Sequence, residues 1–330
     1  MKTKNLKSVI VLTAVLATAA VFSACKKEGG YTDAAAYWSD TYRQRQLNGK
    51  VKTVKTFTDG ATNKCSYLEF GANGNLLKDG TLYTSDGSFS GYVFSYDSQN
   101  RITKAADVDS KGKENTTIVF GYDGSHNVYM PTNFYDLISM NFADLRLQQG
   151  VSSFRCADGS TLYVDAKCTS VSSNHLTFTG TSGSDVSDFL GGTLTNIEVD
   201  YKNNYPTDIK FMTGNTIGAR ETTTLGSNGL PAKLSISLNG STESVIFEFT
   251  TIAGFLLQTK AYPVSNPTQR YEWQYNNKGY VTRMAGYNSD GSSKGEILYS
   301  YEYESQGNWT KQVLTMDTDT LTYTREYTYW

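Results

Sequence analysis

Histidine, cysteine and basic runs are scarce in this sequence, and each scarcity removes a class of function. The chain has two histidines and four cysteines, and neither His126 nor His175 has a cysteine or a second histidine at metal-ligand spacing. A Ser-His-Asp or Cys-His nucleophile would need one of these histidines, and His126 fits best as a turn residue. The formal net charge is −2 and the basic residues are scattered, which argues against nucleic acid as a partner. We therefore expect no metal, no cofactor and no catalytic residues, and a protein that is not an enzyme.

Long apolar runs are also scarce, and the one candidate lies at the N-terminus. Three lysines in the first seven residues precede an uncharged run over residues 8–24, which is typical of a secretory signal. That run is too short for a comfortable transmembrane helix. Its end, Val21–Cys25 (VFSAC), resembles the lipobox of bacterial lipoproteins. The resemblance implies removal of residues 1–24, lipidation of Cys25 and a tether over residues 25–32; an ordinary signal peptide with a chance cysteine is the alternative.

The residues around Cys25 bear on the compartment. Lys26 follows the cysteine at the place where an aspartate would resemble an inner-membrane retention signal, so we expect an outer-membrane lipoprotein. Acyl chains on Cys25 would embed in one leaflet and tether the chain without spanning the bilayer. The sequence leaves both the periplasmic face and the cell surface open.

Aromatic residues, by contrast, are abundant, with 24 tyrosines and 15 phenylalanines, and they recur at a fixed spacing. Each unit has an index residue that ends its first strand, and in most units an apolar residue follows six positions later, beyond a Gly/Asn turn, as Trp309 follows Tyr303. The index residues are Phe70, Tyr96, Tyr122, Tyr201, Leu225, Phe249, Tyr275 and Tyr303. Their separation of about 26 residues is the signature of a repeat array.

Apolar and polar residues alternate strictly ahead of each index residue, which predicts half-buried antiparallel strands. A second set of Gly-containing turns lies half a period away, so each repeat has two strands and two turns. The sequence therefore predicts an all-β, antiparallel β-hairpin repeat array in a single domain over residues 33–330. It leaves open whether the sheet stays open, curves or closes. We also expect a short helix over residues 34–47, which Asp33 would cap at the start of the array.

The pattern breaks between Tyr122 and Tyr201, where we expect an irregular insertion over residues 131–192. Its first part fits a short amphipathic helix or an irregular segment, degenerate strands resume near residue 158, and residues 180–192 read as a loop. Cys156 and Cys168 could close a local disulfide or remain buried thiols. If a special site exists, this region is the first place to look, because function concentrates on loops carried by regular scaffolds.

Two segments carry a resemblance to a known repeat. Phe94–Ile102 (FSYDSQNRI) and Tyr303–Trp309 (YESQGNW) resemble YD repeats of the RHS type, and the chain is similar to repeat-bearing lipoproteins of Gram-negative gut anaerobes. The resemblance covers about residues 47–148 and 192–330 and implies stacked β-hairpins, but no particular activity. Residues 319–321 (DTL) also resemble an O-glycosylation acceptor of such bacteria, which implies modification of Thr320.

Three functions follow as hypotheses. The first is a non-enzymatic envelope binding module for a glycan or a partner protein. The second is a structural or assembly lipoprotein without a small ligand, and the third is a glycan-active hydrolase with paired carboxylates. The aromatic residues could form a platform for sugar rings, but their alternating positions favour a cross-strand core. Glu248, Glu272 and Glu302 recur at one position of the repeat and are best explained as a solvated strand face.

Overall fold

The structure is a computed structural model that describes residues 47–131, 147–238, 245–252 and 255–330. Its strands are β1 Val51–Thr58, β2 Lys64–Phe70, β3 Leu76–Tyr83, β4 Phe89–Tyr96, β5 Ile102–Val108, β6 Glu114–Gly121, β7 Tyr129–Pro131, β8 Leu147–Gln149, β9 Ser153–Asp158, β10 Thr161–Val171, β11 His175–Ser182, β12 Asn196–Lys202, β13 Tyr205–Thr213, β14 Thr216–Leu225, β15 Pro231–Leu238, β16 Val245–Ile252, β17 Phe255–Pro263, β18 Arg270–Tyr275, β19 Val281–Tyr287, β20 Ser293–Tyr303, β21 Trp309–Met316 and β22 Asp319–Tyr329. The described residues contain one helix, α4, Ser184–Leu190.

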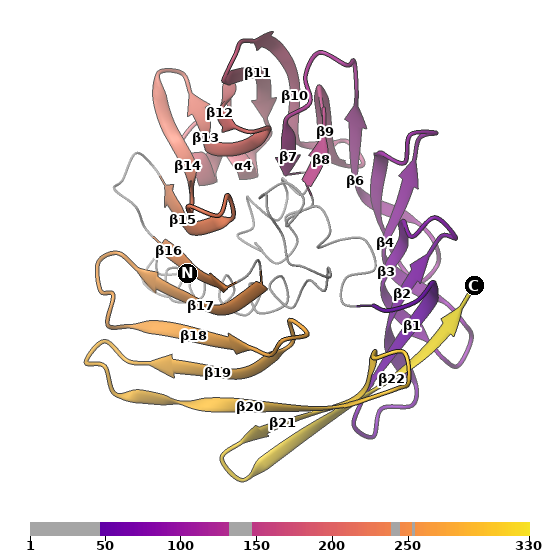
Figure 1. Cartoon of the computed structure of the whole chain (residues 1–330). Helices are drawn as coiled ribbons and strands as arrows, with labels where there is room; N and C mark the ends of the chain where they lie inside the picture. The colour runs from indigo at the N-terminus through magenta and orange to yellow at the C-terminus, as the bar shows by residue number, and fades with distance from the viewer. Residues whose placement is uncertain (1–46, 132–146, 239–244, 253–254) are drawn as a thin grey trace.

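Twenty of these strands form one closed antiparallel sheet (Figure 1). Neighbours in the sheet follow chain order, except that β9 follows β6, because β7 and β8 pair with each other on the inner side of the ring. The ring closes where β1 pairs with β22 as well as with β2, so that Val54 lies opposite both Tyr327 and Leu68. The predicted all-β antiparallel hairpin array is confirmed, and closure removes the edge strands that an open array would expose.

Four of the repeat turns share one feature, a β-bulge next to the index residue. The register shifts by one residue next to the index residue, and the index residue then pairs with the apolar residue six positions later. The pairs are Phe70 with Leu76, Tyr96 with Ile102, Tyr275 with Val281 and Tyr303 with Trp309. Such a bulge bends the strand and strengthens its twist, which a sheet must have in order to close.

Tyrosine hydroxyls join one repeat to the next. Tyr96 donates to the carbonyl oxygen of Leu76 at 2.6 Å, and Tyr122 donates to that of Ile102 at 2.7 Å, each reaching back 20 residues. Tyr301 makes the same bond to Val281 at 2.7 Å. In these three bonds the accepting residue is the apolar residue after the previous turn, whereas the index residue Tyr201 donates to the carbonyl oxygen of Ser172 at 2.8 Å. The recurrence of tyrosine therefore has a structural role, because each of these hydroxyls bonds to the backbone of the preceding repeat.

Three copies of the repeat depart from this pattern, and in one of them Tyr201 pairs with Pro206, five positions later. Tyr122 and Val128 do not pair, because the chain leaves the barrel wall after β6 and turns inward to β7. In the copy at Phe249 the hairpin is longer, so Phe249 pairs with Thr259 and Phe255 pairs with Ile252. The spacing of six therefore marks a tight bulged turn in most copies, but not in all of them.

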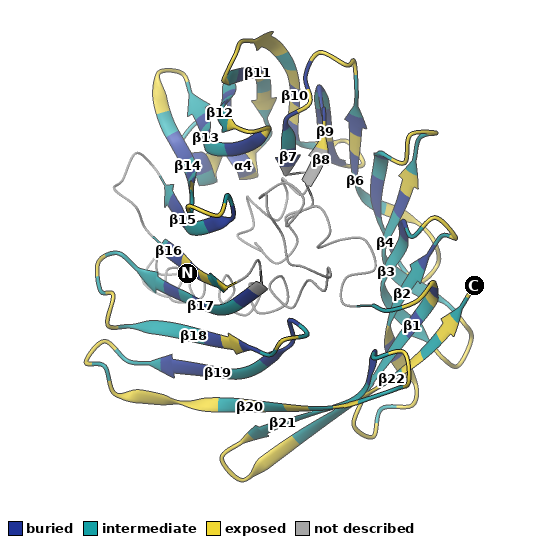
Figure 2. Cartoon of the chain, in the orientation of Figure 1, coloured by how far each residue is buried: buried dark blue, intermediate teal, exposed yellow. Residues whose placement is uncertain are grey.

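Buried, half-buried and exposed residues lie close together along the strands of the wall (Figure 2). Residues at alternate positions, such as Phe94, Phe178 and Trp273, are buried and belong to one core cluster on the inner face. The opposite positions carry charges that face each other across strands: Lys233, Glu248, Lys260 and Glu272 form one such row over β15–β18. Glu248 and Glu302 are exposed, as expected for a solvated face, while Glu272 is half-buried.

The range expected to be irregular, residues 131–192, contains three strands of the barrel wall, β9, β10 and β11, and the helix α4. Residues 180–192, expected as a loop, fold around α4 because Val186 and Leu190 lie four residues apart and are both buried. Gly191 ends the helix in the left-handed conformation, at φ 74°. The expected N-terminal helix, the signal segment and the tether lie outside the described residues, as does the candidate helix over 132–146.

Cys156 and Cys168 are not joined to each other in the structure. Cys156 of β9 pairs with Val164 of β10, and Cys168 lies four residues farther along β10. At about 3.3 Å per residue this offset is about 13 Å, well beyond the Cα separation of about 4.4–6.8 Å that a disulfide spans. The thiol alternative is therefore the one that the strand register allows.

Candidate ligand-binding site

A cleft of about 500 Å³ opens on the wall formed by β3–β6. It lies on the face of β4 that carries the buried Phe94, because Tyr92 in the cleft lies two residues before Phe94. Gly80 and Gly91 face each other across β3 and β4. A Cβ on Gly91, whose φ is 135°, would lie 2.5 Å from the carbonyl oxygen of Asp79, so neither strand has room for a side chain here. The paired glycines therefore let the two strands come close together.

The polar lining comes from three neighbouring strands. Tyr92 of β4 pairs with Asp79 of β3 on one side and with Asp107 of β5 on the other. Because neighbouring strands lie about 4.8 Å apart, the Cα atoms of the two aspartates are about 10 Å apart, with the tyrosine between them. Asn115 of β6 donates from its amide to Asp107 at 3.5 Å and extends the row. Thr81 and Ser90 add hydroxyls to the lining.

Asp109 borders the cleft but serves the β5–β6 turn. Its Oδ1 accepts from the backbone N–H groups of Lys111 and Lys113, both at 2.9 Å. The hydrogen bond from Lys113 is the largest influence, and these bonds hold the pKa of Asp109 below its ordinary value. A glycosidase acid needs a raised carboxyl pKa, so Asp109 is suited to the turn and to accepting hydrogen bonds, not to donating a proton.

The predicted aromatic index residues form the inner wall and not an exposed platform. Phe70, Phe249, Tyr275 and Trp309 are buried, and Tyr96, Tyr122, Tyr201 and Tyr303 are half-buried. Tyr301 illustrates the packing: its ring centroid lies 5.2 Å from that of Tyr280 and 6.2 Å from that of Trp309. Within the described residues, Trp330 is the exposed tryptophan, and the amine of Lys52 lies 4.6 Å from its ring. Most aromatics are therefore structural, as their alternation indicated.

Two further predicted sites lie elsewhere. Thr320 lies near the start of β22 in an exposed hairpin and pairs with Thr315, so it is accessible, and its glycosylation stays a prediction. Cys25 lies outside the described residues, and its lipidation stays a prediction too.

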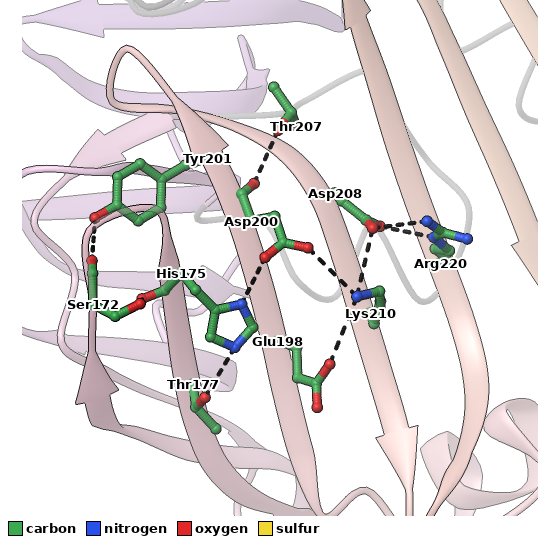
Figure 3. A network of polar contacts seen from close by, with 10 residues as sticks. All are labelled: Ser172, His175, Thr177, Glu198, Asp200, Tyr201, Thr207, Asp208, Lys210 and Arg220. Atoms are coloured by element: carbon green, nitrogen blue, oxygen red, sulfur yellow. Dashed lines mark hydrogen bonds and ion pairs between the residues drawn. The ribbon is translucent and has the colours of Figure 1, made fainter.

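A polar network that sequence reasoning did not find lies on β11–β14 (Figure 3). His175 Nδ1 lies 2.7 Å from Asp200 Oδ1, and Thr177 Oγ1 lies 3.3 Å from His175 Nε2. Lys210 Nζ lies within 3.7 Å of three carboxylates, and Arg220 binds Asp208 through two bonds of 2.8 Å. Partial burial raises the pKa of Asp200, but the bonds from His175 and Lys210 together hold it below its ordinary value. His175 meets Asp200 only through strand pairing, a contact that has no local sequence signal.

The order Thr177, His175, Asp200 is that of a nucleophile, a base and an orienting acid, but the surroundings do not suit acyl transfer. Thr177 lies in mid-strand and pairs with Glu198 on one side and Ser170 on the other, so its backbone serves the sheet ladder and not an oxyanion hole. His175 and Asp200 are 36% and 45% exposed in their side chains. This network is best explained as ion pairs and hydrogen bonds that link four strands on the outer face.

A buried carboxyl group lies on the inner face of the same strands. Glu221 of β14 is 9% exposed, pairs with Ile209 and Ile236, and has an Oε2 atom without a hydrogen-bond partner. Burial raises the pKa of Glu221 to about 7. It also raises the pKa of the neighbouring Tyr205 far above its ordinary value. The environment therefore favours a neutral carboxylic acid.

The described part of the chain holds no group of three or more His, Cys, Asp or Glu side chains arranged for a metal ion. Within the same ranges, no helix has the length and hydropathy needed to cross a membrane.

Comparison with known proteins finds similarity in solved structures only. No family model and no curated protein matches the chain. A porin-like protein from Bacteroides uniformis superposes with a TM-score of 0.33 at 10% identity, covering 85% of this chain and 98% of the other. A porin-like protein from Bacteroides vulgatus gives 0.30 at 8% identity, with the same coverage. A Tc holotoxin pore from Photorhabdus luminescens gives 0.28 at 10% identity, covering 82% of this chain and 15% of the other. At these TM-scores the similarities carry no argument about function, and no family match supports the resemblance to YD repeats.

Proposed function

We propose that this chain is a non-enzymatic, lipid-anchored binding protein of the cell envelope, and that it binds a glycan in the cleft on β3–β6. The observation that carries the proposal is the cleft itself, in which Asp79, Tyr92 and Asp107 stand in one row over about 500 Å³. Ligand sites combine a concave surface with a few convergent polar groups. This cleft is shallow and open, and the polar groups on its wall are the feature that supports the proposal.

The chemistry of the row suits a polyhydroxylated ligand. Carboxylates accept short, charge-assisted hydrogen bonds from hydroxyl groups. A tyrosine ring offers an apolar face for the C–H groups of a sugar. In the strand register Tyr92 lies between Asp79 and Asp107, and Asn115, Thr81 and Ser90 supply groups that can both donate and accept. This arrangement would bind one sugar face by packing and its hydroxyls by hydrogen bonds.

Membrane attachment is assigned to Cys25 and not to the barrel wall. A barrel that spans a bilayer presents apolar side chains outward to lipid. Here the outward row carries facing charges, such as Glu248 between Lys233 and Lys260, while the apolar row is turned inward. The charged row supports a barrel surrounded by water and held at the membrane by an N-terminal anchor.

The test is binding of the full chain, purified in detergent, to an array of plant, host and microbial glycans, followed by titration calorimetry of each hit. Asp107→Asn removes one charge from the cleft without changing its shape, and we expect it to weaken binding at least tenfold, because a hydrogen bond to a charged group is worth about 1.5–3 kcal/mol. The control is Asp165→Asn, an exposed aspartate on β10 that pairs with Arg155. If Asp107→Asn and Asp165→Asn bind a confirmed ligand with equal affinity, the binding site of that ligand lies outside the cleft.

A second function, a structural envelope lipoprotein without a small ligand, is favoured by one observation. The hydroxyls of the repeat tyrosines already bond to the backbone, as those of Tyr96, Tyr122 and Tyr301 do, so the aromatic rows serve the scaffold. If folded protein binds no glycan on the array, this structural function would be favoured.

A further inference from the structure

Arg325 of β22 differs from the other arginines that the structure describes. Each of the others forms an ion pair with a carboxylate of the chain; these are Arg101, Arg155, Arg220, Arg270 and Arg283. In the part of the chain that the structure describes, no carboxylate lies within ion-pair distance of Arg325. Arg325 is half-buried and lies on the same face of β22 as Tyr327, which packs against the inner core. The inner wall therefore carries a guanidinium group that the described carboxylates do not neutralise.

Two neighbours fix the position of the Arg325 guanidinium. Its Cζ lies 3.8 Å from the ring centroid of the buried Trp309, and its Nε donates to Thr56 Oγ1 at 3.0 Å. Burial raises the pKa of Tyr327, and the nearby Arg325 acts in the opposite direction. An arginine has five N–H donors in a planar fork, which can bind an oxyanion through two parallel hydrogen bonds. Because stacking and the bond to Thr56 already order this fork, Arg325 is preorganised to bind an anion.

A row of hydroxyl groups runs from Arg325 across the inner wall to the cleft. Strand pairing places Arg325 opposite Thr56, Thr56 opposite Ser66, Ser66 opposite Thr81, and Thr81 opposite Ser90. These residues come from the neighbouring strands β22, β1, β2, β3 and β4 (Figure 1). Residues opposite each other on paired strands share one face of the sheet. Ser66 is exposed and the other four are half-buried, and Thr81 and Ser90 line the cleft. The polar lining of the cleft therefore continues to Arg325.

The two ends of this row differ in charge. Asp79, Asp107 and Asp109 line the cleft at one end, and Arg325 lies at the other. Arg325 and Thr81 are three strand spacings apart, and at about 4.8 Å each the distance along the wall is about 14 Å. The Debye length is about 8 Å at physiological ionic strength, so an anion at Arg325 is largely screened from the cleft carboxylates. The wall therefore suits a ligand with an anionic group at one end and neutral hydroxyl groups at the other.

We propose that Arg325 binds the acidic group of a glycan whose neutral part lies in the cleft on β3–β6. This inference rests on the proposed glycan function and names the ligand class, an acidic oligosaccharide. Its charged group is a single oxyanion, either a carboxylate or a sulfate ester, which lies toward β22. The span of about 14 Å exceeds one sugar ring, so the ligand has several sugar units. The hydroxyls of Thr56, Ser66 and Thr81 bond to the hydroxyl groups of the sugars between the two ends.

The experiment compares oligosaccharides that differ only in their acidic group. The full chain, purified in detergent, is applied to an array of neutral oligosaccharides, galacturonic acid oligomers, the methyl esters of these oligomers, and sulfated galactose oligomers with their desulfated forms. We expect acidic members to bind. Removal of the charge, by methyl esterification or by desulfation, should weaken binding at least tenfold, because hydrogen bonds between two charged groups are stronger than those to a neutral acceptor. Binding of a carboxylate or of a sulfate ester supports the inference and distinguishes the two oxyanions.

Titration calorimetry of two variants then assigns the preference to one side chain. Arg325→Gln removes the positive charge, so its affinity for the acidic ligand should fall at least tenfold, and its preference for the acid over the uncharged form should disappear. The matched control is Arg155→Gln, which changes an exposed arginine that pairs with Asp165 and should keep both properties. An Arg325→Gln variant that binds the acid as tightly as the wild type does would overturn the inference.

Measurements on the wild type alone cover an Arg325→Gln variant that fails to fold. Affinity for the acidic ligand should fall at least threefold when NaCl rises from about 50 mM to about 500 mM, whereas affinity for the uncharged form should not, because salt screens the charge of the guanidinium. Equal affinity for the two forms, or binding of neutral glycans alone, overturns the role of Arg325 and leaves the proposal for the cleft standing. Binding of no glycan overturns both.

Discussion

Replacing Glu221 by Gln should remove a dependence of stability on pH that a buried carboxyl group imposes. The carboxyl pKa is about 7 in the folded protein, against an ordinary value of 4.5. Because the folded pKa is raised, the protonated acid contributes stability in full below pH 4.5, and this contribution is lost as the pH rises through 7. At 1.36 kcal/mol per pKa unit, the contribution is about 3 kcal/mol. Glutamine has nearly the same shape and does not ionise, so the unfolding free energy of Glu221→Gln should lack this pH-dependent contribution.

The assay is urea denaturation followed by circular dichroism at pH 4.5, 6, 7 and 8.5 for the wild type and for Glu221→Gln. We expect the wild type to lose about 3 kcal/mol of unfolding free energy relative to the variant across this range. Glu248→Gln, on the exposed outer row of β16, is the control and should keep the wild-type profile. Profiles of wild type and Glu221→Gln that run parallel within about 0.5 kcal/mol would refute the argument, because the carboxyl group would then be solvated or paired.

Three further predictions test the repeat and the anchor. Tyr96→Phe removes the hydroxyl that reaches Leu76 O, and it should lower the unfolding free energy by about 1–2 kcal/mol; an unchanged urea midpoint would show that water replaces the bond. Phe249→Ala deletes a buried ring and should cost about 3–5 kcal/mol in the same assay, so a loss below about 1 kcal/mol would contradict its place in the core. Cys25→Ala should abolish metabolic labelling with a fatty acid and leave the protein uncleaved or outside membrane fractions, whereas normal labelling would contradict the lipobox.

The regular part of the fold could be predicted because its causes are local. Alternation at a spacing of two gives strands, and an index residue followed by a Gly/Asn turn gives a bulged hairpin, as Tyr275 and Val281 illustrate. Closure of the ring could not be predicted in this way. It depends on the pairing of Val54 with Tyr327 between opposite ends of the chain, and on the twist that many bulges add together.

The contacts that give the sites their chemistry are also non-local. Asp79 and Asp107 lie in different repeats and become neighbours of Tyr92 only through strand register. His175 and Asp200 meet in the same way. His126 was predicted to be a residue of a repeat turn, but that turn does not form, and His126 is buried in the irregular segment between β6 and β7. Its burial follows from the inward course of β7, which the repeat pattern does not encode. The helix α4 had a local signal, the spacing of Val186 and Leu190, which the many Ser and Gly residues around it obscured.

The most direct test of the central claim, that the cleft on β3–β6 is a ligand site, is the exchange footprint of a glycan identified on the array. We expect the bound glycan to slow hydrogen–deuterium exchange in the hairpin ends at residues 83–90 and 108–114, which adjoin the cleft, in the wild type but not in Asp107→Asn. Protection confined to another part of the barrel, or the same footprint in Asp107→Asn, would contradict the claim.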